Sequence, residues 1–125
     1  MKILTIKQPW AGLILKGRKT IELRTWSTAY RGPVVIHAGR AFDKRGAVYE
    51  PSGKPGHTLC VVDLMDVRRA TASDMDSACV GHLGLRHEDY FSWVLADVRA
   101  IKEQPLRGAL GLCHVPDSIS LFASA

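Results

Sequence analysis

The chain has few of the side chains from which disulfide frameworks and metal sites are built. Its three cysteines, an odd number, stand far apart in the sequence at Cys60, Cys79 and Cys113. Neither a set of disulfide bonds nor a zinc knuckle is expected from such spacing. Cys60 and Cys113 lie in apolar strand patterns, where a free thiol packs as a small hydrophobic group. The five histidines show no metal-ligand spacing, so we predict no metal and no cofactor.

The sequence also lacks a long apolar run. No stretch approaches the roughly 18 residues that a membrane-spanning helix needs. Residues 1–4 have neither the apolar segment nor the cleavage site of a signal peptide. The chain has 125 residues, 46% hydrophobic and 23% charged, as is typical of a globular protein, with no repeat or linker. We expect one cytoplasmic domain spanning residues 1–125 and no membrane partner.

The charge balance favours an anionic partner. The formal net charge is +5 and the isoelectric point is near 9.4. Such a balance steers nucleic acid toward a protein, although many basic proteins bind none. The cations concentrate at residues 16–24, at residues 31–45 and at Arg68–Arg69.

Hydrophobic periodicity predicts an α+β fold with five or six mostly antiparallel strands. Pro9 suits the first turn of a short helix, and Gly17 suits its C-terminal stop. An early helix followed by strands without a βαβ rhythm indicates a small closed or partly open β-barrel. One or two further short helices are expected, the clearest between Ser73 and Cys79. The predicted strands cover residues 2–7, 20–26, 34–37, 58–67, 90–102 and 110–115, and residues 40–57 form a long loop.

The most informative segment runs from Gly17 to Arg24 and reads Gly-Arg-Lys-Thr-Ile-Glu-Leu-Arg. It places four charges at the junction of the short helix and the next strand. Strand alternation sends Glu22, Arg24 and Trp26 to one face and the apolar residues between them to the other. Lys19, at the start of the strand, has a stem long enough to bring its ammonium to the same side. Charges and an indole on one face suit the wall of a polar cleft better than a core.

The order of motifs along the chain resembles the ASCH (activating signal cointegrator homology) domain, a family of PUA-like β-barrels. The resemblance rests on Gly-x-Lys-x-x-Glu-x-Arg at residues 17–24, preceded by Gln-Pro-Trp and followed by Tyr-Arg-Gly-Pro and Val-Ile-His-Ala-Gly. It continues in the strands at residues 60–66 and 93–98 and in the closing Gly-Leu at residues 111–112. The resemblance implies a small barrel that recognises RNA or other nucleic acid in a cleft lined by this motif.

Each charged residue of the motif has a functional and a structural interpretation. Lys19 is either the charged base of a pocket, where it contacts phosphate or moves a proton, or an exposed loop lysine, and the resemblance favours the pocket. Glu22 holds Lys19 or Arg24 in place, or accepts a proton or a base N–H; the structural interpretation is a surface ion pair worth under about 1 kcal/mol. Arg24 either cradles a phosphate with its planar guanidinium or anchors Glu22.

Aromatic and basic residues near the motif are further candidates for ligand contact. Trp26 shares the face of the motif's charges and suits stacking on a base, which contributes about 1–3 kcal/mol. Trp10 is expected instead to pack the helix onto the barrel. Arg31, His37 and Arg40 are placed at the barrel rim. Each of them contacts the ligand there, or else has a structural role. In that case the two arginines are solvated and His37 is hydrogen-bonded within the protein.

Two classes of function follow, and the first is a binding module for RNA, another nucleic acid or a nucleoside. A basic rim would hold phosphate, an aromatic face would stack, and the mixed-charge pocket would read a base edge. We rank this class first and leave the oligomeric state open.

The alternative is a small hydrolase. One branch of the family resembles this chain around Gly-Arg-Lys-Thr-Ile and hydrolyses the amide of N4-acetylcytidine, using the lysine, a threonine three residues later and a distant carboxylate. Here the residue three positions after Lys19 is Glu22, so that hydroxyl nucleophile is missing. A catalytic Lys19–Glu22 pair that activates water, or that stabilises charge in a ribonuclease reaction, is the enzymatic alternative.

Overall fold

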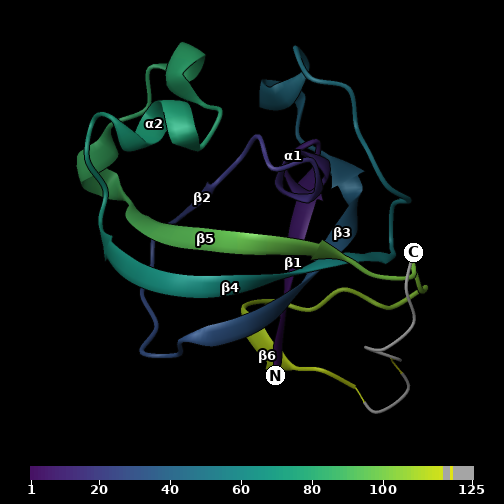
Figure 1. The fold of residues 1–125 in the computed structure, drawn as a ribbon. Coiled ribbons are helices and arrows are strands. Elements are labelled where there is room, and N and C mark those ends of the chain that lie inside the picture. The colour runs from purple at the N-terminus through teal and green to yellow at the C-terminus, as the bar shows by residue number, and fades with distance from the viewer. Residues whose placement is uncertain (117–118, 120–125) are drawn as a thin grey trace.

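A strongly curved six-stranded sheet forms the centre of the computed structural model, which describes residues 1–116 and 119 (Figure 1). The strand order is β2-β5-β4-β3-β1-β6, and only the β1–β3 pair is parallel. Hydrogen bonds do not close the sheet, so the predicted α+β barrel is confirmed in its partly open form. The strands are β1 (Lys2–Gln8), β2 (Ile21–Arg24), β3 (Gly32–Phe42), β4 (Thr58–Arg69), β5 (Phe91–Ala100) and β6 (Leu112–His114).

The two faces of the sheet bury separate apolar clusters. In β3, Val34 and Ile36 belong to the larger cluster inside the curve, whereas Val35 belongs to a smaller one on the opposite face. This division follows from the alternation of side chains along a strand. The central strands are therefore apolar on both faces, as the uninterrupted apolar run Leu-Cys-Val-Val at residues 59–62 of β4 indicates.

The short helix α1 (Trp10–Leu15) is fixed at its start by Gln8. The Gln8 Oε1 accepts a hydrogen bond from the backbone N–H of Gly12 at 2.9 Å, and its Nε2 donates to the Ser52 carbonyl at 2.6 Å. One buried side chain thus satisfies a free N–H of the first turn and ties the helix to the loop that follows β3. Gly12 is needed for this contact, because a β-carbon there would lie 2.5 Å from the Ser52 oxygen.

A tight turn after α1 delivers the charged motif to β2. The carbonyl of Leu13 accepts from the backbone N–H groups of Arg18 and Lys19 at 3.0 and 3.1 Å, and Gly17 has a φ of +77°. A positive φ at the end of a helix is the conformation that glycine adopts without strain. The chain therefore reverses within a few residues, and Lys19 lies two residues before the start of β2.

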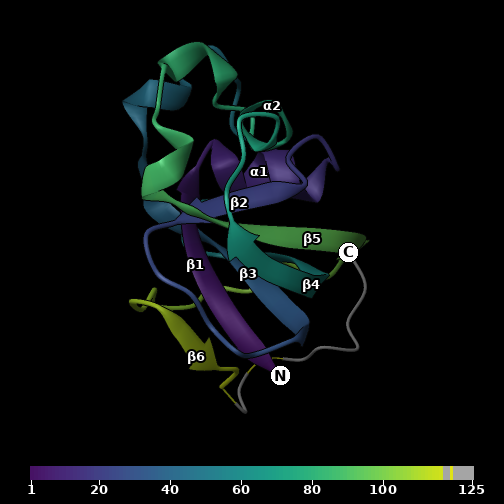
Figure 2. The ribbon, with the colours of Figure 1, turned by 90° about the vertical axis from the view of Figure 1, so that its left-hand side faces the viewer.

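The other short helices gather with α1 at one end of the sheet, whereas β6 and the N-terminus lie at the opposite end (Figures 1 and 2). They are α2 (Asp74–Ser77), η1 (Lys44–Gly46), η2 (Gly81–Leu83) and η3 (His87–Asp89). Within residues 1–116, no helix is long and apolar enough to cross a membrane. Two predicted boundaries differ in a way that affects the site: the strand expected over residues 20–26 ends at Arg24, and β3 extends to Phe42 into the expected loop.

Replacement of Gly12 with alanine tests the packing of α1 against the loop. In an ordinary helix interior this change stabilises by about 1 kcal/mol. Here the new methyl group meets backbone, so we expect urea unfolding to show a loss of about 1–3 kcal/mol. Gly39→Ala is the matched control, because a β-carbon at Gly39 makes an ordinary contact at 3.5 Å. A Gly12→Ala variant as stable as the wild type would contradict this packing.

Candidate functional site

A cavity of about 400 Å³ lies between β1 and β2, two strands that are not neighbours in the sheet. Its walls come from β1, α1, β2, the segment at residues 43–45, the segment at residues 80–90 and the chain before β6. The apolar lining is Ile6, Trp10, Leu23, Val80, Leu83, Leu85, Ala109 and Leu110. The charged lining is Lys7, Lys19, Glu22, Arg24, Asp43 and Arg45, with Thr5, Tyr90 and Gly111 completing the wall.

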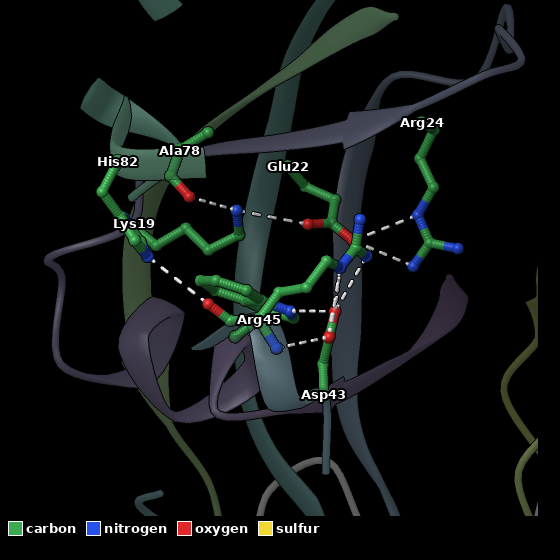
Figure 3. Close-up of polar contacts among 8 residues, drawn as sticks. Lys19, Glu22, Arg24, Asp43, Arg45, Ala78 and His82 are labelled. Atoms are coloured by element: carbon green, nitrogen blue, oxygen red, sulfur yellow. Dashed lines mark hydrogen bonds and ion pairs between the residues drawn. The ribbon is translucent and has the colours of Figure 1, made fainter. Parts of the chain in front are cut away.

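Lys19 is the most deeply buried charged residue of this cavity, with 2% of its surface exposed. Its Nζ donates to the Ala78 carbonyl at 2.7 Å and lies 3.5 Å from Oε1 of Glu22 (Figure 3). It also lies 5.3 Å from the centroid of the Trp10 ring. The Ala78 carbonyl is presented at the end of α2, where Cys79 adopts a φ of 62°. Such a left-handed residue is uncommon outside glycine and turns the chain sharply at this contact.

Burial lowers the pKa of the Lys19 ammonium, and the nearby Glu22 carboxylate opposes this shift. The direction follows from desolvation, which disfavours the charged form of an amine. Lys19 therefore loses its proton at a lower free-energy cost than an exposed lysine would.

Glu22 connects Lys19 to Arg24. Its Oε2 accepts from Nε of Arg24 at 3.1 Å and lies 3.0 Å from Nη2 of the same guanidinium. Nη2 also donates to the backbone carbonyl of Thr5 in β1 at 3.2 Å. The three motif side chains thus form one chain of contacts that spans the cavity from α2 to β1, and Arg24 both anchors Glu22 and faces the cavity.

A second ion pair forms the opposite wall. Asp43 accepts from Nη2 of Arg45 at 2.9 Å (Figure 3). It also accepts from Nε1 of Trp10 at 3.0 Å. The hydrogen bonds from Arg45, aided by the one from Trp10, hold the pKa of the Asp43 carboxyl well below its usual range. Asp43 therefore stays ionised and fixes the indole, while the Arg45 side chain remains 60% exposed.

The cavity as a whole is positive. Four cationic side chains and two carboxylates line it, and each carboxylate is already paired with an arginine. Charge of one sign in a partly enclosed cleft attracts ligands of the opposite sign. The arrangement therefore suits an anion that also has an apolar or aromatic part.

Trp26 and Arg31, two of the predicted ligand contacts, are not in the lining of the cavity. The ring of Trp26 packs edge-on against Trp93, with centroids 4.8 Å apart, and its backbone carbonyl accepts from Nε1 of Trp93. Arg31 pairs with Asp66 at 3.5 Å on an exposed turn. Trp26 leaves the face of the motif because β2 ends at Arg24, so strand alternation no longer applies at residue 26.

His37 and Arg40 also lie outside the lining. His37 is buried in β3, where it bonds to Thr5 and to the Leu106 carbonyl. Arg40 is exposed at the far end of β3, beside Gly56. Of the seven predicted site residues, the structure brings together Lys19, Glu22 and Arg24.

Several lining residues were not predicted. Asp43 and Arg45 reach the cavity from the loop after β3, and Val80 and Tyr90 reach it from the segment between β4 and β5. The local pattern Asp-Lys-Arg-Gly at residues 43–46 would have indicated a capped turn, because the Asp43 side chain accepts from the Arg45 N–H. Among the described residues, no group of three histidine, cysteine or acidic side chains is placed to hold a metal ion.

The fold and cavity together define a small open-barrel domain with a positively charged cleft. The family model for the ASCH domain matches residues 4–105. The chain belongs to the ASCH domain family. A search of curated proteins found no match.

Solved structures of the same family have the same fold. The crystal structure of ASCH from Zymomonas mobilis superposes with a TM-score of 0.62 at 15% identity, over 93% of this chain and 87% of that one. A tyrosine-to-phenylalanine variant of that protein superposes with a TM-score of 0.62 at 14% identity, over 93% of this chain and 90% of the variant. A serine-to-alanine variant superposes with a TM-score of 0.62 at 14% identity, over 93% of this chain and 88% of the variant. At these identities the comparison establishes the fold alone.

The lowered pKa of Lys19 predicts a specific dependence of stability on pH. Between the folded pKa and the ordinary lysine value of about 10.4, the unfolded chain binds more protons than the folded one, so stability rises with pH. We expect the wild type to gain unfolding free energy relative to Lys19→Met as the pH rises from about 7 to 10. Urea unfolding at several pH values measures this gain. Lys16→Met, at an exposed lysine, should run parallel to the wild type; parallel curves for Lys19→Met would contradict the burial argument.

Proposed function

We propose that the protein binds a nucleotide of RNA, or of another nucleic acid, in the cleft between β1 and β2. The observation that carries the proposal is the layout of charge in the cavity. The buried Lys19–Glu22 pair lies at its base, and the guanidiniums of Arg24 and Arg45 line the same space with Lys7. The volume of about 400 Å³ falls within the usual range for small-molecule sites.

The two parts of a nucleotide match two parts of the lining. Trp10, Val80 and Leu83 offer an apolar wall for a base. Arginine forks bind phosphate in a planar, bidentate manner, so Arg24 and Arg45 are the expected phosphate contacts. Family membership adds support, because the resemblance in sequence implies recognition of nucleic acid in this region.

The motif pair supplies a donor and an acceptor to a base edge. The ammonium of Lys19 has three N–H groups, and among the residues that the structure describes, its one short hydrogen bond is to the Ala78 carbonyl, at 2.7 Å. Oε1 of Glu22 lies 3.5 Å from that ammonium, which is an ion-pair distance longer than a strong hydrogen bond. An incoming base can therefore accept from Lys19 and donate to Glu22 without displacing the bond to Ala78.

Fluorescence anisotropy with a labelled single-stranded RNA tests this function. Lys19→Met should weaken binding at least about tenfold, because a hydrogen bond from a charged donor contributes about 1.5–3 kcal/mol. Arg45→Gln should lower the slope of log Kd against log salt by about one, because one phosphate contact is lost.

Arg86→Gln is the matched control for the arginine change. Arg86 is paired with Glu88 and Asp89 outside the cavity lining. Its replacement should leave the affinity and the salt slope unchanged. Equal affinities for Lys19→Met and the wild type would contradict a binding site at this cleft.

The lowered pKa of Lys19 favours one second candidate, a hydrolase in which Lys19 and Glu22 are catalytic. A lysine with a lowered pKa can accept a proton from an attacking water. Glu22 would orient the amine of Lys19 for this step. The wild type is incubated with N4-acetylcytidine and, separately, with labelled RNA. Product that is formed by the wild type and absent with Lys19→Met would establish this candidate in place of a pure binding module. Binding without product would exclude it for these substrates.

A further inference from the structure

The chain before β6 forms one wall of the cleft and is held by a defined set of hydrogen bonds. Ala109, Leu110 and Gly111 line the cavity. Just before them, the Leu106 N–H donates to the Gly56 carbonyl at 2.9 Å, and the Leu106 carbonyl lies 2.8 Å from Nε2 of His37. We name residues 106–111 the closing wall.

His37 is connected to the closing wall through a chain of hydrogen bonds. The Leu106 carbonyl can only accept, so Nε2 of His37 carries a hydrogen and donates to it. The other ring nitrogen, Nδ1, lies 3.0 Å from the Thr5 hydroxyl oxygen. The Thr5 oxygen accepts in turn from the Ala109 N–H at 3.4 Å. A histidine with 1% exposure thus acts on a residue of the cleft wall through one hydroxyl.

Beyond Ala109 the closing wall carries an apolar side chain with no cover. Leu110 lines the cavity, yet 97% of its surface is exposed. An apolar side chain at the edge of a cleft becomes buried only when something enters the cleft. The wall can adjust at Gly111, which has a φ of +70° and nothing within 4 Å of the position of a β-carbon. It is packed closely at Gly108, where a β-carbon would lie 3.2 Å from Cγ2 of Thr5.

We propose that Leu110 is a ligand-contacting residue that packs against the bound base, and that Thr5, whose hydroxyl joins His37 to Ala109, is a positioning residue that sets the closing wall. This inference rests on the proposed function, since it assigns a further apolar contact of the ligand in the same cleft.

The Leu110 arm of the test uses the full chain and a labelled single-stranded RNA. Leu110→Ala should weaken binding about tenfold, as expected for the loss of most of a buried leucine contact. Met65→Ala, at another exposed apolar residue outside the cavity lining, is the matched control and should bind like the wild type. Leu110→Ala with wild-type affinity would overturn the assignment while leaving the proposed function intact.

The positioning arm removes and restores one hydroxyl. Thr5→Val deletes it at nearly constant shape, and Thr5→Ser keeps it. We expect the amide of Ala109 to exchange with solvent deuterium at least about ten times faster in Thr5→Val, with RNA binding weakened several-fold and both properties recovered in Thr5→Ser. The unfolding free energy, measured on each variant, separates this local effect from a general loss of stability. Unchanged exchange at Ala109 would overturn the positioning role.

Failure of the proposed function has a different signature. If the wild type binds no RNA at any salt concentration, the proposed binding of a nucleotide in the cleft is contradicted, and so is the assignment of Leu110 as a ligand contact. The exchange of the Ala109 amide in Thr5→Val still decides, by itself, whether the Thr5 hydroxyl holds the closing wall.

Discussion

The burial of one ammonium group governs the architecture of the site. A charge taken out of water needs partners of the right geometry, because its desolvation costs several kcal/mol. Lys19 finds them on three separate parts of the chain: the Ala78 carbonyl, the Glu22 carboxylate and the Trp10 ring. The turn at Gly17 and the left-handed Cys79 are the backbone features that bring these groups together. The buried Lys19 ammonium therefore fixes the positions of α1, β2 and α2 relative to one another.

The cleft is largely organised before any ligand arrives. Glu22 is held between two cations, and Asp43 between Arg45 and Trp10. Groups already fixed in place lose little conformational freedom on binding, which favours affinity. The outer cations retain solvent-facing surface, so a phosphate can add to these pairs without breaking them. The closing wall is the part of the lining with an exposed apolar side chain, and it is where adaptation to a ligand is expected.

The sequence predicted the parts of the site that are local. Lys19, Glu22 and Arg24 lie within six residues. Strand alternation placed Glu22 and Arg24 on one face, and the length of the Lys19 side chain indicated that its ammonium would reach the same side. Alternation failed for Trp26, because the strand ended two residues earlier and the side chain turned toward Trp93. Asp43 and Arg45 could not be found by periodicity, since their position depends on a loop that folds back from β3. A small closed or partly open barrel was predicted from strand number and the absence of βαβ units. The extension of β3 to Phe42 could not be predicted, because it depends on pairing with β1, where Gln8 lies opposite Phe42.

The central claim is that the cleft around Lys19 receives the nucleotide. Backbone amide NMR during titration with a short single-stranded RNA tests it most directly. The account predicts the largest shifts at Lys19, Glu22 and the closing wall, with little change at the exposed pair Arg68–Arg69. Shifts confined to Arg68–Arg69, with the signals of Lys19 and Glu22 unmoved, would contradict it.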